Sequence, residues 1–150
     1  MKAPNGYKFR VRTFQVQETV DERGPRVEGA PQALTHLSAI MEADCDLDVE
    51  QLVVLALNAR GGVIGFKVVG RGTATACVIH PREVFRAAIT LGAVHILVAH
   101  NHPSGDATPS PEDLAMTKML REAGQIIGIP VIDHLVLAKT RSGWSARSAA

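Results

Sequence analysis

The sequence contains few aromatic residues, few cysteines and no excess of either charge. Phe, Trp and Tyr together make up 4% of the 150 residues, which disfavours an aromatic-rich binding platform. The formal net charge of +1 gives no overall field that would attract nucleic acid. A small basic cluster, formed by Lys8, Arg10 and Arg12, is interpreted as the solvent-facing side of an edge strand. The charge balance therefore gives no support to a nucleic-acid-binding domain.

The two cysteines, Cys45 and Cys77, lie far apart in the sequence. Neither has a Cys or His at the spacing of a metal site, so both are interpreted as small apolar core residues. Without a framework of paired cysteines, a reduced cytoplasmic setting is expected. The sequence also lacks a signal-like apolar segment and any run approaching the length of a membrane span. These absences predict a soluble cytoplasmic protein.

Aliphatic residues are plentiful, and their pattern predicts mixed secondary structure. Hydrophobic residues make up 46% of the chain, enough for the core of one domain. Continuous apolar runs over residues 51–57 and 93–99 are typical of strands buried on both faces. The first run and residues 63–69 form a predicted hairpin across the turn at 58–62. Further strands are predicted over 7–20, 74–79 and 129–139, and helices over 30–41, 81–92 and 111–123. This order predicts an α/β domain with a mixed β-sheet and helices on both faces.

Candidate metal ligands follow directly after the predicted strand at 93–99, at its carboxyl end. His100 and His102 are two residues apart, so in extended backbone their side chains point to the same side, and Asn101 points to the other. Asp113 lies in the first turn of the next predicted helix, and a loop rich in Pro and Gly can fold that turn back over the histidines. Two imidazoles and one carboxylate are the ligand set of catalytic zinc, with a fourth position left for water.

Ser110 and Asp113 also have a simpler explanation. Their spacing is that of a capping box, and Pro111 suits the first position of the helix. Taken alone, the pair is interpreted as the N-terminal cap of the predicted helix. His100 and His102 alone could be ordinary loop residues. The two explanations are compatible, because Ser110 can cap the helix and still stand beside a metal.

The segment HNHPSGDATPSPED resembles the motif of the RadC family within the JAMM metalloprotease superfamily, also called MPN+ or JAB domains. The superfamily pattern is His-x-His, ten residues and Asp, with a serine three residues before the Asp. This sequence meets every position of the pattern with His100, His102, Ser110 and Asp113. The resemblance therefore implies that His100, His102 and Asp113 bind zinc, with Ser110 beside the metal.

The resemblance extends to residues 78–85 and 132–136, and it covers roughly residues 47–140. It implies a JAB/MPN fold, a three-layer α/β/α arrangement similar to that of cytidine deaminases. We expect residues 1–46, a strand and a helix, to belong to the same domain as the RadC-like catalytic part. Residues 141–150 are expected to form a C-terminal tail.

The family also places a glutamate upstream, at the start of a strand, and Glu50 occupies the matching position before 51–57. A carboxylate at hydrogen-bond distance can take a proton from metal-bound water. If the strand after Glu50 and the strand before His100 are neighbours, they must be antiparallel for the two residues to meet. Without the resemblance, Glu50 would be interpreted as a solvated charge at a strand end.

The resemblance implies a zinc-dependent hydrolase that cleaves peptide or isopeptide bonds, with Glu50 as the base and Ser110 as a donor to the oxyanion. Its expected partner is a protein or peptide substrate, and the ligand set leaves Mn²⁺ and Fe²⁺ open. Nucleobase deamination requires His-x-Glu and Pro-Cys-x-x-Cys signatures, and the sequence has neither.

Two other functions remain open. A DNA-repair-associated module without hydrolase activity is the first, although no helix-hairpin-helix pattern is visible in the first 46 residues. We therefore expect a stand-alone catalytic domain. A structural domain without turnover, as one half of a homodimer, is the second. It is disfavoured because every ligand position is kept.

Four other histidines receive structural interpretations. His134 follows Asp133 at a strand start, and a neutral polar pair at the sheet edge is preferred over a contact with a metal ligand. His95 is expected to be a hydrogen-bonded core side chain, His36 to be exposed on a helix, and His80 to mark a helix entry.

Overall fold

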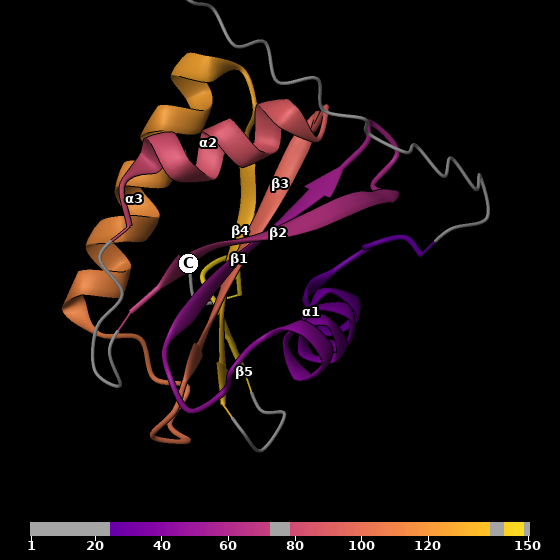
Figure 1. Ribbon diagram of the computed structural model, residues 1–150. Helices are drawn as coiled ribbons and strands as arrows, with labels where there is room; N and C mark the ends of the chain where they lie inside the picture. Colours follow the sequence, from indigo (N-terminus) through magenta and orange to yellow (C-terminus); the bar gives the residue numbers. More distant parts are fainter. Residues whose placement is uncertain (1–24, 73–78, 139–142, 149–150) are drawn as a thin grey trace, which may run out of the picture.

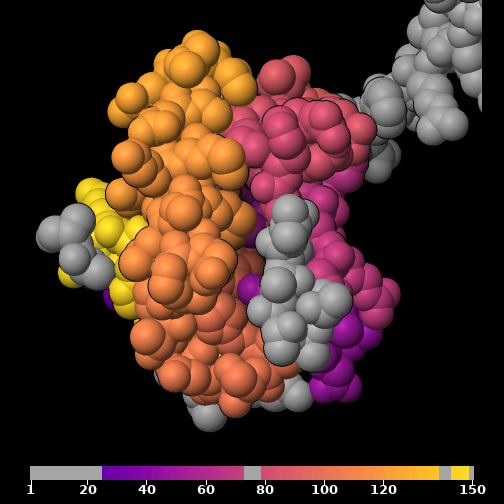
Figure 2. All heavy atoms as spheres, turned by 90° about the vertical axis from the view of Figure 1, so that its left-hand side faces the viewer, coloured from indigo at the N-terminus to yellow at the C-terminus, as the bar shows by residue number. Residues whose placement is uncertain are grey.

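A single β-sheet with helices on both faces forms the fold of the computed structural model, which describes residues 25–72, 79–138 and 143–148 (Figure 1). Helices α2 and α3 cover one face, where they lie side by side (Figure 2), and α1 covers the other. The prediction of a three-layer α/β/α domain is therefore confirmed. The elements are α1 (Ala30–Asp44), β1 (Gln51–Leu57), β2 (Val63–Arg71), α2 (Pro81–Thr90), β3 (His95–His102), α3 (Pro111–Ile127), β4 (Val131–Ala138) and β5 (Gly143–Ser145).

The strand order of the five-stranded sheet is β2-β1-β3-β4-β5. Strands β1 and β2 form the predicted antiparallel hairpin, and β1 also pairs antiparallel with β3. Strands β3 and β4 are parallel, and α3 provides the crossover connection between them. Leu52 lies opposite His100 in the β1–β3 ladder, so the beginning of β1 meets the end of β3. This is the antiparallel arrangement that Glu50 requires to reach the histidines.

Each face of the sheet has its own apolar core, because side chains alternate between the faces along every strand. Every residue of β1 is buried, which explains its continuous apolar run. The core under α2 and α3 contains Leu52, Val54, Ile96, Val98, Val84, Phe85 and Leu120. The core under α1 contains Val53, Leu55, Leu97, Ala99, Leu37 and Met41.

Two element ends differ from the prediction. Residues 100–102, expected to begin a loop, belong to β3 because the pairing with β4 continues to the last residue, where His102 lies opposite Ala138. Helix α3 continues past Gly124 to Ile127 and ends where Gly128 adopts a left-handed conformation with φ of 80°. The histidines therefore lie on a rigid strand and not in a loop.

Other predictions are wrong or fall outside the described residues. Strand β5 was not predicted, yet it pairs antiparallel with β4 in a segment expected to form a tail. On α3, the apolar side chain of Met119 is 42% exposed, whereas that of Leu120 is fully buried. None of the helices in the described part of the chain has the length and apolar character of a membrane span. The structure does not describe the predicted strand at 7–20 with Lys8, Arg10 and Arg12, residues 74–78 of another predicted strand, or Cys77.

Asn101 holds the entry of β1 against the end of β3. Its Oδ1 accepts a hydrogen bond of 2.9 Å from the Gln51 backbone nitrogen, and its Nδ2 donates one of 3.0 Å to the Val49 carbonyl. The two contacts bracket Glu50 on both sides in sequence. Because Asn101 is buried, these bonds are shielded from water, and they fix the backbone that carries Glu50.

We predict that Gly124→Ala destabilises the protein although alanine favours helices. A β-carbon at this position would lie 2.7 Å from the Ile129 carbonyl oxygen and 3.3 Å from Cζ of Phe85. Such overpacking costs about 1–3 kcal/mol, which exceeds the gain of about 1 kcal/mol in helix propensity. Urea denaturation would therefore show a lower free energy of unfolding.

Ala115→Gly provides the control at an exposed position of the same helix. It should lower the free energy of unfolding by about 1 kcal/mol through propensity alone. A Gly124→Ala variant as stable as the wild type, or more stable, would contradict the close approach of α3 to its exit loop.

Candidate metal centre

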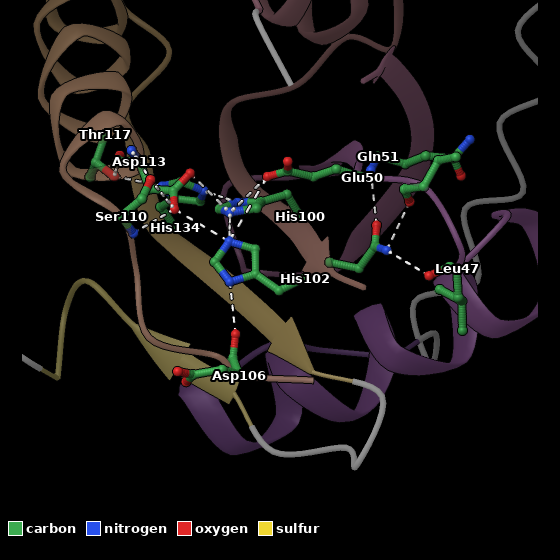
Figure 3. Close-up of polar contacts among 12 residues, drawn as sticks. Leu47, Glu50, Gln51, His100, His102, Asp106, Ser110, Asp113, Thr117 and His134 are labelled. Atoms are coloured by element: carbon green, nitrogen blue, oxygen red, sulfur yellow. Dashed lines mark hydrogen bonds and ion pairs between the residues drawn. The ribbon is translucent and has the colours of Figure 1, made fainter. Parts of the chain in front are cut away.

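Four side chains that could hold a metal ion converge beside the carboxyl end of β3: Glu50, His100, His102 and Asp113 (Figure 3). One potential ligand atom from each lies within 4.8 Å of the others. The histidines project from the same side of β3, Asp113 comes from the first turn of α3, and Glu50 directly precedes β1. Glu50, His100 and Asp113 are buried, and the side chain of His102 is 15% exposed. The cluster is therefore shielded on most sides and open to solvent beside His102.

His100, His102 and Asp113 lie slightly closer together than the ligands of a tetrahedral zinc ion would. The Nε2 atoms of His100 and His102 are 3.0 Å apart. Asp113 places Oδ1 3.1 Å from the first nitrogen and Oδ2 3.3 Å from the second. Ligands about 2.0–2.2 Å from a tetrahedral zinc ion would be roughly 3.3–3.6 Å apart. Glu50 is farther away, with Oε1 at 3.7 and 3.9 Å from the two nitrogens.

The loop after β3 accepts a hydrogen bond from the His102 ring. The Nδ1 atom of His102 is 2.8 Å from the carbonyl oxygen of Asp106, where the chain turns back at Gly105 with φ of 86°. A carbonyl oxygen only accepts hydrogen bonds, so Nδ1 carries the proton. When the ring is neutral, its lone pair is therefore on Nε2, the atom that faces the cluster.

His134 packs directly against His100 (Figure 3). Its Nε2 is 2.8 Å from Nδ1 of His100, and its Nδ1 is 2.5 Å from Oγ1 of Thr117. Burial, followed by the effect of nearby His100, lowers the pKa of His134 to about 3, so this ring is neutral at pH 7. Thr117 was not predicted to take part. The available signal was its position four residues after Asp113, which places both on the same side of α3.

The preferred interpretation of Asp133 and His134 as a pair at the sheet edge is wrong. Strand β4 lies between β3 and β5, and both residues are buried. Asp133 forms its contacts on the opposite side of the strand from His134. It accepts a hydrogen bond of 2.6 Å from the Ser145 hydroxyl and one of 2.9 Å from the Arg147 backbone nitrogen. Only His134 thus contacts the cluster, and Asp133 instead ties β5 to β4.

The two carboxyl groups have opposite pKa shifts. Burial raises the pKa of Asp113, but the adjacent His100 imidazole and hydrogen bonds from Ser110 outweigh it and hold this pKa well below its usual value. Burial also raises the pKa of Glu50 and outweighs the lowering effect of the two histidines. Neighbouring carboxyl groups with divergent pKa values are suited to different tasks. Asp113 stays an anion down to acidic pH, whereas Glu50 takes up a proton more readily.

Ser110 forms the predicted capping box with Asp113. Its Oγ accepts a hydrogen bond of 3.1 Å from the Asp113 backbone nitrogen. Its own backbone nitrogen donates a hydrogen bond of 2.7 Å to Oδ2 of the Asp113 carboxylate. The hydroxyl also donates to Oδ2 at 2.8 Å. The box orients the Asp113 carboxylate toward the histidines. The hydroxyl must give up its bond to Oδ2 before it can donate elsewhere.

The other histidines lie away from the cluster. His80 caps α2, as expected for the start of a helix. Its Nδ1 accepts a hydrogen bond of 3.2 Å from the Arg82 backbone nitrogen. His95, expected in the core, is only half-buried at the first residue of β3, and His36 is half-buried on α1.

Comparison with known proteins agrees with the geometry. The family model of the RadC-like JAB domain matches residues 30–149. The chain is 52% identical over 93 residues to UPF0758 protein STH371 of Symbiobacterium thermophilum, covering 62% of this chain and 40% of the relative. It is 45% identical over 102 residues to a UPF0758 protein of Desulforamulus reducens, covering 68% and 45%.

A UPF0758 protein of Staphylococcus haemolyticus is 50% identical over 92 residues, which cover 61% of this chain and 40% of that protein. The chain thus spans less than half the length of these relatives, and their names describe no activity. The family model covers most of the chain, and all four residues of the cluster lie within the matched range. By sequence and by fold, the chain belongs to the RadC-like JAB domain family.

Proposed function

We propose that this chain is a zinc-dependent hydrolase that cleaves a peptide or isopeptide bond through a metal-activated water. The observation that carries the proposal is the convergence of two imidazole nitrogens and two carboxyl groups in one largely buried cluster. Several electron-pair donors this close together repel one another and are poorly solvated. A divalent cation would remove that repulsion.

The donor set fits catalytic zinc. His100 and His102 would each supply Nε2, and Asp113 a carboxylate oxygen, which leaves the fourth position of a tetrahedral ion open to water. When bound, the metal would lower the pKa of that water and polarise the substrate carbonyl. The Ser110 cap and the His134 contact hold two of these side chains in place before any metal arrives.

Glu50 is suited to move the proton. It stands just outside the group of three, within 4 Å of both histidine nitrogens, and its raised pKa is appropriate for a general base. Glu50 would accept a proton from the attacking water and deliver it to the leaving amine nitrogen. Ser110 would turn its hydroxyl away from Asp113 and donate to the oxyanion that develops on the substrate.

The metal proposal predicts that the purified protein contains about one zinc ion per chain. His100→Ala/His102→Ala removes both nitrogen ligands, so its metal content should fall to about a tenth of the wild-type value or less. Inductively coupled plasma mass spectrometry measures zinc, manganese and iron in the same sample. His36→Ala, on α1, is the control that keeps its metal. A wild-type protein that binds no divalent metal, even after incubation with zinc, would contradict the proposal.

The base proposal predicts that Glu50→Gln keeps its metal but loses turnover by about 100-fold or more, the usual contribution of a general base. Mass spectrometry of a library of peptides and isopeptide-linked peptides measures the hydrolysis. Glu112→Gln removes the same charge from an exposed position beside Asp113 and should hydrolyse at the wild-type rate. Wild-type turnover in Glu50→Gln would exclude the residue as the base.

A further inference from the structure

A chain of hydrogen bonds connects His100 to Asp113 beside the candidate metal centre (Figure 3). It runs from Nδ1 of His100 to Nε2 of His134 at 2.8 Å, and from Nδ1 of His134 to Oγ1 of Thr117 at 2.5 Å. The Thr117 hydroxyl then lies 2.7 Å from the carbonyl oxygen of Asp113. The chain thus joins β3, β4 and α3, and it begins and ends on residues that we propose as metal ligands.

The carbonyl at the end sets the direction of every bond in this chain. The Asp113 carbonyl can only accept, so the single hydroxyl proton of Thr117 lies on that contact. The hydroxyl oxygen then accepts from Nδ1–H of His134. A neutral His134 with its proton on Nδ1 has a lone pair on Nε2, which accepts from Nδ1–H of His100. The lone pair of His100 is therefore on Nε2, the atom that faces the cluster.

The surroundings of His134 favour the neutral ring. The residue is 1% exposed, and its two nitrogens contact a hydroxyl and another imidazole, neither of which is an anion. A buried imidazolium with no anion in direct contact would be costly. It would also donate from both nitrogens and force His100 to accept at Nδ1.

We propose that His134 and Thr117 are positioning residues that hold His100 in the tautomer with a free Nε2 and thereby set the metal affinity of the site. The inference rests on the proposed function only in so far as the cluster binds a metal. Ligand histidines commonly donate to a carboxylate or a backbone carbonyl. Here the acceptor is a neutral imidazole, which orients the ring without adding a third negative charge beside Glu50 and Asp113.

Thr117→Val tests this relay through a side chain that is not a proposed ligand. Valine has nearly the same shape, but it cannot accept from His134, which is then free to carry its proton on Nε2. His134 would then donate from Nε2 to Nδ1 of His100. His100 would have to carry its own proton on Nε2, the nitrogen that the metal needs. Zinc affinity, measured by competition with a chromogenic chelator, should therefore fall by about 10–100-fold.

Thr90→Val is the matched control. The Thr90 hydroxyl also bonds to the carbonyl four residues earlier, at the same distance of 2.7 Å, but it is exposed on α2. Its loss should leave zinc affinity unchanged. Thr117→Ser retains the hydroxyl and should restore affinity. His134→Gln can still accept from His100 and should bind zinc more tightly than His134→Leu.

Imidazole nitrogen NMR of the zinc-free protein at neutral pH reads the tautomer directly. The wild type should show His100 protonated at Nδ1, and Thr117→Val should show protonation at Nε2. Wild-type zinc affinity in Thr117→Val, or a wild-type His100 protonated at Nε2, would overturn the inference. If the wild type binds no metal, the proposed function fails, whereas the tautomer in the zinc-free protein still decides whether the relay exists.

Discussion

Pairing of β3 on both sides up to its last residues is the constraint on which the candidate site depends. Leu52 of β1 lies opposite His100, and Ala138 of β4 lies opposite His102. This pairing keeps the backbone extended where the sequence alone suggests that a loop begins. The extended backbone places both imidazoles on one side of the sheet and Asn101 on the other. A strand that ended earlier would leave the histidines without a fixed relation to each other.

The elements around β3 then bring acidic groups to the histidines. Antiparallel β1 delivers Glu50 to the end of β3, with its backbone held by Asn101. Helix α3 begins beside the same strand end, and its capping box turns the Asp113 carboxylate inward. The apolar cores on the two faces of the sheet anchor these elements, so the polar cluster is supported by packing at a distance from its chemistry. Polar groups gathered in this way could hold a cation, and binding one would stabilise the folded chain.

The local part of the site was predictable from the sequence, and the part made by tertiary pairing was not. The spacing of His100, His102, Ser110 and Asp113 fits a strand end followed by a capped helix, which is local information. Glu50 required the family resemblance, because nothing local distinguishes it from an exposed charge. The short strand β5 was also not predicted, because it is defined by its pairing with β4 and not by a pattern in its own sequence.

The contact of His134 with His100 joins residues 34 positions apart and depends on the register of two parallel strands. No periodicity in the sequence specifies that register, so the preferred interpretation placed His134 at a sheet edge. The helix predicted to end at residue 123 continues through Gly124 to Ile127. The close approach of Gly124 to the Ile129 carbonyl is likewise a tertiary contact that no local pattern specifies.

Anomalous diffraction at the zinc edge from crystals of the metal-loaded protein tests the central claim most directly. We expect one strong peak about 2.0–2.2 Å from Nε2 of His100, Nε2 of His102 and a carboxylate oxygen of Asp113. A peak coordinated by other residues, or a fully loaded crystal with no peak among these three side chains, would contradict it.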